Sequence, residues 1–424
     1  MRVAVIGTGI SGMVAAWMLE RDHEVTVYEA SSWVGGHTNT VDIQVDGRRY
    51  AIDTGFIVHN TRTYPNLVRI FDHLGVSTRA TDMSFSVKEQ ATGLEYASRA
   101  ILARRRNALN PRVLRMVRDI LRFNREAEGI VEAGDEATTL GDLLEDGRYS
   151  KAFTDLYIVP MGAAIWSTDA RRMLSFPAHA FVRFLINHGL TSLTDRPRWR
   201  VVEGGSREYV RRLTASFADR IRLETPVETV TRSARGVTVC PLDGPPEHYD
   251  RVVIATHSDQ ALKMLTDASD AEREILGAIR YQENRAVLHT DTTLLPRERR
   301  AWASWNYEIP KQRSDRVVVT YDMNSLQGIE DTKTNFCVTL NAEGRIDPTR
   351  VLYETTYHHP LYDPAALAAQ KRVREISGAR NTYYCGAYWR HGFHEDGVVS
   401  ALAVAHQFGI SLDNRLGGSA KEAA

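Results

Sequence analysis

The N-terminal segment carries the pattern that most restricts how this chain folds. An apolar run over residues 3–6 ends at the glycine-rich turn Gly7-Thr8-Gly9-Ile10-Ser11-Gly12, and a helical pattern follows. A second run, over residues 24–28, alternates polar and apolar positions and ends at Glu29. A strand, glycine turn, helix, strand and terminal acid in this order form the fingerprint of a dinucleotide-binding βαβ unit. The sequence therefore predicts an α/β domain that holds a dinucleotide.

Each glycine of the turn has a separate physical task. Gly7 permits the tight turn, Gly9 lets the backbone approach a diphosphate, and Gly12 allows the helix to pack closely on the strand. Ile10 and Ser11 begin the helix, whose free N–H groups favour negative charge. Glu29 is expected to accept hydrogen bonds from ribose hydroxyls.

The residues after Glu29 point to one cofactor. A glycine pair in Gly35-Gly36-His37-Thr38 and the segment from Asp53 through Gly55 and Phe56 resemble FAD-binding families related to amine oxidases and phytoene desaturases. This resemblance implies a glutathione-reductase-like FAD-binding Rossmann domain of the α/β class with an inserted α+β substrate domain, as in amine oxidases. The further positions expected to contact FAD are Gly35, Gly36, His37, Thr38, Gly55, Phe56, Ile57, Val227, Ala255, Gly386, Asp396, Gly397 and Val398.

The C-terminal region supplies a second part of the expected flavin site. A strand pattern over residues 381–385 ends at Gly386, and residues 392–397 lead into a helix. In the resembling families such a helix points its N-terminus at the flavin, which stabilises charge on that ring. Many relatives carry an acid just after the strand glycine. Ala387 stands there in this chain, so Glu395 or Asp396 is expected to replace that acid; a plain amphipathic helix capped at Asp396 is the alternative.

The composition of the chain, and the motifs that it lacks, argue against several classes of function. Lys plus Arg equals Asp plus Glu at 53 each, so no net charge favours nucleic acid. Three scattered cysteines provide neither a disulfide framework nor a metal site, so no metal is expected. No second GxGxxG occurs, which argues against a separate NAD(P)H domain. No apolar run reaches the roughly 18 residues that cross a bilayer, and no signal-peptide cleavage site follows the N-terminus. We expect a cytoplasmic protein that is at most peripheral on a membrane.

The FAD-binding domain is expected to be discontinuous, comprising residues 1–79, 199–260 and 351–424. A mostly helical piece (80–198) and a strand-rich piece (261–350) would form the substrate domain. Within the second piece, residues 316–321 and 335–340 alternate apolar and polar positions, which predicts strands.

One segment departs from the even charge balance. Between residues 99 and 125 the only acid is Asp119, and apolar residues are interleaved at roughly helical spacing. The basic residues are Arg99, Arg104, Arg105, Arg106, Arg112, Arg115, Arg118, Arg122 and Arg125. This pattern indicates either a solvated amphipathic helix or a patch that binds the anionic surface of a membrane.

Several blocks match more than a general flavoprotein. Residues 64–67, 82–87, 304–307, 358–361 and 392–397 resemble the flavin oxidoreductase domain that is fused to plant cyclopropane fatty-acyl-phospholipid synthases, and its stand-alone bacterial relatives. The resemblance implies oxidation, for example desaturation, of a fatty-acyl chain carried by a phospholipid. It also implies a lipid methyltransferase as a separate partner.

Allylic oxidation by a flavin requires a C–H bond held in a dry pocket and a group that accepts a proton. The catalytic candidates are His59, Tyr64, His394 and Glu395, with His391 near the last two. A flavin amine oxidase acting on a small amine remains an alternative, as does a flavin-bound partner of a lipid methyltransferase without its own turnover.

Overall fold

The computed structural model describes residues 1–424 except 100, 102–104, 136, 193, 312–315 and 418–424. Its nucleotide-binding part is built on a five-stranded parallel sheet in the order β10-β2-β1-β14-β20. The strands are β1 (Arg2–Ile6), β2 (Glu24–Tyr28), β10 (Ile221–Arg222), β14 (Arg251–Ile254) and β20 (Thr382–Tyr384). The predicted βαβ unit is therefore present, with β1 at the centre of the sheet.

Alternation along the strands divides the apolar side chains between the two faces of this sheet. Val3 and Val5 pack in one core with the helices α1 (Ile10–Leu19), α2 (Pro65–Leu74), α9 (Arg207–Thr214) and α15 (His394–Gln407). Ala4 and Ile6 face a second core on the other side. That core includes α10 (Ser258–Met264), α11 (Asp270–Gly277), α13 (Pro364–Lys371), α14 (Val373–Ile376) and the antiparallel strands β11 (Val227–Ser233), β12 (Gly236–Pro241) and β13 (Glu247–Tyr249).

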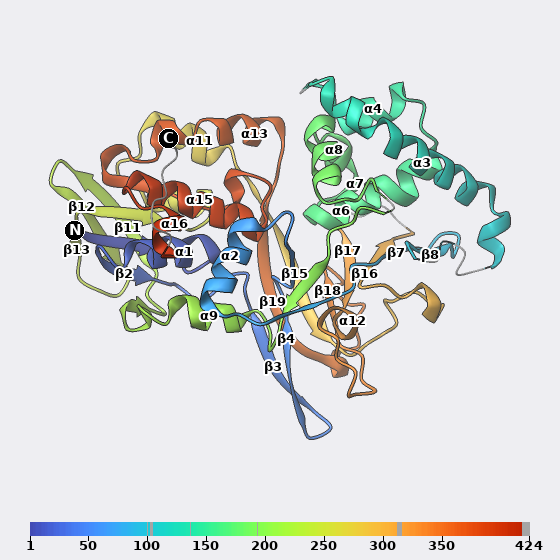
Figure 1. The fold of residues 1–424 in the computed structure, drawn as a ribbon, viewed down its shortest axis with the longest axis horizontal. Helices are drawn as coiled ribbons and strands as arrows, with labels where there is room; N and C mark the ends of the chain where they lie inside the picture. Colours follow the sequence, from blue (N-terminus) through green and yellow to red (C-terminus); the bar gives the residue numbers. More distant parts are fainter. Residues whose placement is uncertain (100, 102–104, 136, 193, 312–315, 418–424) are drawn as a thin grey trace.

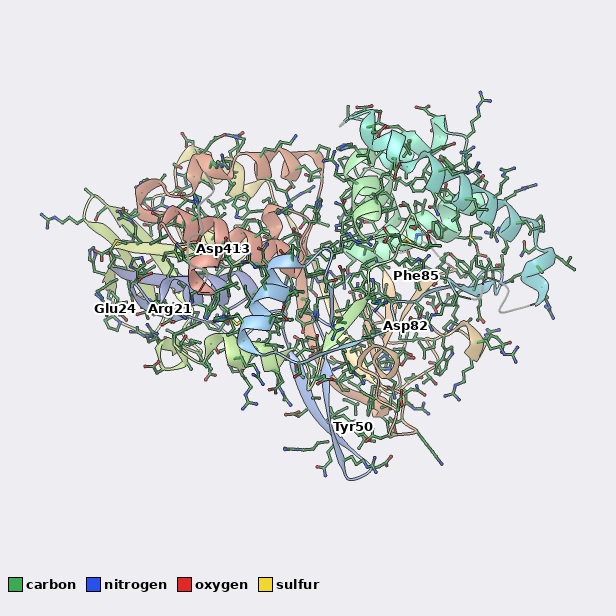
Figure 2. All side chains as sticks on the ribbon, viewed as in Figure 1. Arg21, Glu24, Tyr50, Asp82, Phe85 and Asp413 are labelled. Carbon is green, nitrogen blue, oxygen red and sulfur yellow. The ribbon has the colours of Figure 1, made fainter. Side chains whose placement is uncertain are left out.

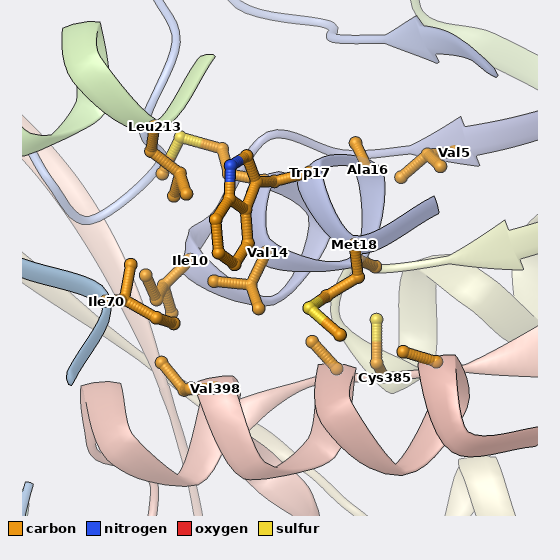
Figure 3. Close-up of a cluster of buried hydrophobic side chains, with 14 of the residues drawn as sticks. Val5, Ile10, Val14, Ala16, Trp17, Met18, Ile70, Leu213, Cys385 and Val398 are labelled. Atoms are coloured by element: carbon orange, nitrogen blue, oxygen red, sulfur yellow. The ribbon is translucent and has the colours of Figure 1, made fainter. Parts of the chain in front are cut away.

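Helix α1 is buried along its whole length because it lies between the sheet and α15. Figure 3 shows Val14 and Met18 of α1 on the side that faces α15, near Val398 and Cys385. The short helix α16 (Leu412–Arg415) completes this layer. The first helix and the last long helix of the chain therefore form one packed unit.

A seven-stranded sheet forms the second part of the molecule, in the order β19-β15-β18-β17-β16-β7-β8. Its strands are β7 (Phe85–Glu89), β8 (Glu95–Ala97), β15 (Tyr281–His289), β16 (Trp305–Ile309), β17 (Val318–Asp322), β18 (Cys337–Leu340) and β19 (Val351–Pro360). The predicted strands at 316–321 and 335–340 correspond to β17 and β18. Strands β7 and β16 run parallel, which brings two of the family-specific blocks, 82–87 and 304–307, side by side.

The expected division at residue 351 does not coincide with a sheet boundary. Strand β19 pairs with β15 from Tyr281↔Pro360 to His289↔Val351, so it is the edge strand of the seven-stranded sheet. Helices α10 and α11, part of which lies beyond the expected boundary at 260, pack in a core of the nucleotide-binding sheet. Residues 351–360 therefore belong to the seven-stranded sheet, and α10 and α11 belong to the nucleotide-binding half.

A helical lobe stands beside the seven-stranded sheet, at the upper right of Figure 1. It contains α3 (Pro111–Glu132), α4 (Leu140–Asp146), α5 (Lys151–Phe153), α6 (Val159–Trp166), α7 (Ala170–Leu174) and α8 (Ala178–Asn187). Of the segment 99–125, where the apolar residues have roughly helical spacing, residues Arg105–Leu109 form a 3-10 helix and the α-helix begins only at Pro111. Helix α3 begins at Pro111 because Asn110 accepts a hydrogen bond from Arg112 N (2.9 Å) and proline suits the first helical position. Arg104 lies outside the described residues.

Smaller elements join the two sheets. They are the hairpin β3 (Thr40–Val45) and β4 (Arg48–Asp53), the three-stranded sheet β5 (Val58–Asn60), β9 (Trp199–Val202) and β6 (Thr78–Ala80), and α12 (Met323–Gln327). Figure 2 shows Glu24 and Asp413 in the nucleotide-binding half and Asp82 and Phe85 in the other half, with side chains filling the space between the ribbons. Among the described residues, no helix combines the length and apolarity needed to cross a bilayer.

Candidate flavin site

The glycine-rich turn after β1 is held against the end of β14. Gly7 has φ +100°, and a Cβ atom there would lie 3.0 Å from the carbonyl oxygen of Ala255. A Cβ atom on Gly12 would lie 1.9 Å from the carbonyl oxygen of Gly7 and 3.1 Å from Ala255 Cβ. Both positions therefore need glycine for the fold itself, and Ala255 lies beside the turn, as expected for a site residue.

Gly9 differs from the other two glycines. Its backbone angles (φ −59°, ψ 172°) suit any residue, and a Cβ atom there would meet no protein atom within 4 Å. Gly9 is the N-cap of α1, and no side chain caps this helix end. Open space before uncapped N–H groups, next to the partial positive charge of a helix N-terminus, fits a diphosphate.

Two further segments contact the glycine turn, and a third contacts the first of these two. Glu29 accepts hydrogen bonds from Thr8 N (2.9 Å) and Ser31 N (2.8 Å), which places its carboxylate beside the glycine turn. A Cβ atom on Gly36 would lie 3.2 Å from Gly9 Cα, so the glycine pair touches the turn directly. Val227 follows two residues after Thr225, whose N–H donates to Glu29 O (2.8 Å).

The segment containing Gly55 lies against the residue after the glycine pair. A Cβ atom on Gly55 would lie 2.1 Å from His37 O, and Phe56 N donates to that same oxygen (2.8 Å). Ile57, two residues after Gly55, is buried in the core beneath the seven-stranded sheet. The predicted cofactor segments thus reach from the nucleotide-binding sheet to the substrate half.

The N-terminus of α15 joins the same site. A Cβ atom on Gly397 would lie 2.6 Å from Ile10 Cγ2 and 2.8 Å from Ser11 Oγ. Val398 is fully buried beside Ile10 (Figure 3), and Gly386 N donates to Ser400 Oγ (3.0 Å). Two helix N-termini, from opposite ends of the sequence, therefore lie in contact where the diphosphate is expected.

The comparisons with known proteins agree with this arrangement. A family model for flavin containing amine oxidoreductases matches residues 10–294. The chain belongs to this family. Its cofactor is FAD, and it is an FAD-dependent oxidoreductase. The glycine cradle, the acid at Glu29 and the paired helix N-termini are the residues of this flavin oxidoreductase that would hold the dinucleotide.

Solved structures share the fold of the flavin oxidoreductase at low sequence identity. The CLA-producing fatty acid isomerase from P. acnes is 17% identical, with a TM-score of 0.69 over 96% of this chain and 99% of that chain. Cyclohexylamine oxidase from Brevibacterium oxydans IH-35A is 16% identical (TM-score 0.67, 96% and 99%). Putrescine oxidase bound to putrescine is 15% identical (TM-score 0.66, 96% and 99%). No curated protein matches the sequence.

His394, the first residue of α15, is held in a buried network. Its Nε2 lies 2.9 Å from Thr38 Oγ1 and 3.0 Å from the Tyr209 hydroxyl, and its ring stacks on Phe56 with centroids 3.6 Å apart. Burial, with nearby His37 and His59, lowers the pKa of His394 well below its usual value. The ring is therefore neutral, and it ties the flavin oxidoreductase's Thr38 and Phe56 segments to α15.

The two acids of α15 have partners within the protein. Glu395 accepts from Asn66 N (3.0 Å), Asn66 Nδ2 (2.7 Å) and Leu67 N (3.0 Å), so it caps the N-terminus of α2. Asp396 accepts from Phe393 N (3.0 Å), and burial raises its pKa to about 6. Both oxygens of Glu395 accept hydrogen bonds from the start of α2, which gives this carboxylate a structural role; its expected roles as a base or as a replacement for the ribityl acid stay predictions. The alternative cap at Asp396 is wrong, because the N-cap is Phe393.

We predict that Glu395→Ala lowers the free energy of unfolding by about 2 kcal/mol, because two backbone N–H groups at the start of α2 lose their acceptor. Thermal unfolding of the FAD-loaded protein measures this change. Glu395→Gln keeps one carbonyl acceptor and should be intermediate in stability, with turnover close to that of the unmodified enzyme. A Glu395→Gln protein of normal stability and abolished turnover would support the catalytic assignment.

His59 and Tyr64 remain catalytic candidates. His59 is buried, and its Nδ1 has no hydrogen-bond partner among the described residues. Burial and the nearby Arg200 lower the pKa of His59 to about 4, so the ring is neutral at physiological pH. Tyr64 lies beside it (ring centroids 6.5 Å apart), and burial raises the pKa of its hydroxyl above the usual range. His59 can therefore accept a proton, whereas Tyr64 stays protonated.

A histidine cluster surrounds His37, which was expected to contact FAD, and it adds His257, which the sequence did not single out. The ring of His37 stacks on Tyr357 (4.8 Å) and lies 5.5 Å from His359 and 6.1 Å from His257. Burial, with neighbouring histidines, lowers the pKa of His37 and His359 to about 3 and that of His257 to about 4. The described residues contain no group arranged to hold a metal ion. The block at 358–361 was the sequence signal that pointed to part of this cluster. Its contact with His37 could not be predicted, because it depends on the pairing of β19 with β15.

Proposed function

We propose that this enzyme oxidises, by desaturation, an acyl chain of a phospholipid or fatty acid. The observation that supports it is an aromatic wall where the helical lobe meets the start of α15. Phe184 of α8 stacks on Phe393 (centroids 5.1 Å apart) and on His188 (3.8 Å), and His188 faces Trp199 (6.3 Å). Aromatic and apolar surface of this kind suits a hydrocarbon chain.

Charge at the same place favours a lipid over an amine. A cationic amine would be stabilised by a free carboxylate, but Glu395 and Asp396 already accept hydrogen bonds from the protein. Burial lowers the pKa of His188 to about 4 and also lowers that of His391, so both rings are neutral. Of the structural relatives, one is named as acting on a fatty acid and two as oxidases of amines. Membership of the family therefore does not by itself decide between a lipid and an amine substrate.

Bound FAD supplies an acceptor for a hydrogen and two electrons from a C–H bond. The protein's own residues position the acyl chain and accept the proton that it loses. The aromatic wall excludes water from the reacting carbon. Loss of hydride from an allylic carbon leaves a cation, and His59, which is neutral with an unpartnered Nδ1, is the group proposed to accept the neighbouring proton. His394 and Tyr209 hold the side-chain hydroxyl of Thr38 by hydrogen bonds.

Anaerobic bleaching of the bound flavin tests this function. We expect mixed-micelle phospholipids with an unsaturated or methyl-branched chain to remove the oxidised-flavin absorption, while putrescine and cyclohexylamine leave it unchanged. Mass spectrometry of lipids from cells with and without the protein should then show a product lighter by two hydrogens. Bleaching by amines alone would support the amine-oxidase alternative. If neither class bleaches the flavin, the protein is a partner without turnover.

The resemblance to a domain fused to a lipid methyltransferase supports a methyltransferase as partner. In that arrangement one enzyme modifies the acyl chain and the other oxidises the position beside the modification. Co-purification of the two proteins from cells, with and without the methyltransferase gene, tests the association.

A further inference from the structure

The outer face of α3 has an unusual composition for a surface helix. After Pro111, its exposed positions over the first four turns are occupied by leucine and arginine, without an acid. These residues are Leu114, Arg115, Arg118, Leu121 and Arg125. Leu114 is 55% exposed and Leu121 44%, and Leu109, just before the helix, is 86% exposed. Three of the eight large apolar side chains that the described residues leave exposed therefore lie in this one segment.

The arginines differ in how far they are neutralised. Arg112 forms two hydrogen bonds with Glu89 (2.9 and 3.0 Å), and Arg118 pairs with Asp119 (3.1 Å). Arg99 pairs with Asp82. Arg106, Arg115 and Arg125 are exposed and have no carboxylate partner within the described part of the chain. The outer face of α3 thus keeps uncompensated positive charge beside exposed leucines.

A hollow of about 210 Å³ opens beside Arg115 at the base of this face. It is lined by Arg112, Arg115, Ser150, Lys151, Ala152 and Asp155. Arg112 is paired with Glu89, and Lys151 with Asp155 (2.6 Å). Arg115 is therefore the lining cation that has no carboxylate partner in the described part of the chain, and its guanidinium is free to bind an anion. The volume of the hollow exceeds the roughly 30 Å³ that one water molecule occupies in the liquid. A phosphate group with its neighbouring headgroup atoms fits this space and charge.

We propose that the outer face of α3 docks on an anionic phospholipid bilayer, with a headgroup phosphate in the hollow at Arg115 and with Leu109, Leu114 and Leu121 inserted among the acyl chains. Alternating leucine and arginine match the boundary between apolar chains and anionic headgroups, where each basic residue contributes about 1 kcal/mol. A solvated helix gains nothing from exposing leucine, and a nucleic-acid surface would not need it. Charge complementarity and apolar exposure together select the bilayer.

The position of α3 gives this docking a consequence. Helix α3 packs on α8, which contains Phe184 of the aromatic wall and is followed directly by His188. The lobe therefore lies between the docked surface and the start of α15 (Figure 1). The docking proposal does not depend on the substrate, since a peripheral enzyme of any specificity could use such a face.

Flotation of the FAD-loaded protein with vesicles tests the proposal. We expect binding to vesicles of phosphatidylcholine with about one third phosphatidylglycerol, weak binding to phosphatidylcholine alone, and loss of binding as salt rises. Arg115→Glu changes the local charge by two units and should weaken binding roughly thirtyfold. The double variant Leu114→Ser, Leu121→Ser should bind roughly tenfold more weakly. This loss should not shrink as the salt concentration rises, because it removes apolar contact and not charge.

The matched control carries the same types of change on the β11–β13 sheet. Arg235→Glu with Leu242→Ser alters one exposed arginine and one exposed leucine, and should bind vesicles normally. Flavin content and thermal unfolding confirm that each variant is folded. Equal binding to both vesicle types, or equal loss in the control, would overturn the proposal. Binding only to an acidic protein would assign the face to a protein partner instead. Flavin bleaching by micellar lipid should be unchanged in Arg115→Glu, which separates this test from that of the substrate.

Discussion

Gly9→Val is expected to yield a folded protein without FAD. The backbone angles at Gly9 suit valine, and a Cβ atom there meets no protein atom within 4 Å, so the chain itself tolerates the change. The added side chain would instead fill the space before the N-terminus of α1, where the diphosphate must approach the backbone. We expect the purified variant to be colourless, with flavin content per chain reduced from near one to near zero, and with the circular dichroism of a folded apoprotein.

A second glycine provides the control. Gly129 in α3 also has no atom within 4 Å of a Cβ position, but it lies far in sequence and on a different lobe from the site. Gly129→Val should retain full flavin content. Gly12→Ala provides the opposite comparison, because its Cβ atom would lie 1.9 Å from Gly7 O and should prevent the unit from folding. A yellow Gly9→Val protein at full occupancy would refute the diphosphate assignment.

Arg232→Met is expected to destabilise the nucleotide-binding half by about 3–5 kcal/mol. The guanidinium of Arg232 is fully buried and donates to both oxygens of Glu272 (2.8 Å each) and to Asp267 (2.6 Å). Tyr384 of β20 donates to Glu272 as well (2.6 Å), so the network ties β11, α11 and β20 together. Removing the arginine leaves the Glu272 carboxylate buried without its counter-charge, and the unfolding temperature should fall by about 5 °C.

The same network predicts the dependence of this stability on pH. Burial alone would raise the pKa of Glu272, but hydrogen bonds from Arg232 and Tyr384 outweigh burial and lower it from 4.5 to about 2. Because the folded pKa is depressed, the stabilisation is complete above pH 4.5 and is lost as the pH falls toward 2. Unfolding measured across this range should show a smaller loss in Arg232→Met. The control Arg372→Met removes a partly exposed arginine that pairs with Glu274 and Glu375, and should leave the unfolding temperature unchanged. Equal shifts in the two variants would contradict the role of the buried pair.

Local patterns in the sequence predicted the elements whose residues are close together in the chain. The βαβ unit with Gly7, Gly9 and Gly12 is such a case, since each glycine acts on a neighbour within a few residues or on the next strand. Strands β17 and β18 were predicted for the same reason, because alternation along a strand is a local property. The FAD assignment required the added resemblance of the segments around Gly36 and Gly55.

Features that depend on distant pairing could not be predicted in this way. Strand β19 belongs to the seven-stranded sheet because it pairs with β15, and nothing within residues 351–360 specifies that partner. Glu395 was expected at the flavin because it stands at the start of α15, but it caps α2, which lies more than three hundred residues earlier in the chain. The histidine cluster brings together His37, His257 and His359 from three separate segments, so no local spacing could reveal it.

The contact between α1 and α15 sets the order in which this protein can mature. During synthesis the glycine turn leaves the ribosome early, yet the surface of α1 that α15 covers stays bare until the last long helix has emerged. Strand β20, at the sheet edge beside β14, is equally late. The nascent chain must therefore protect a half-built nucleotide site from aggregation until α15 has emerged, and cofactor capture follows that step.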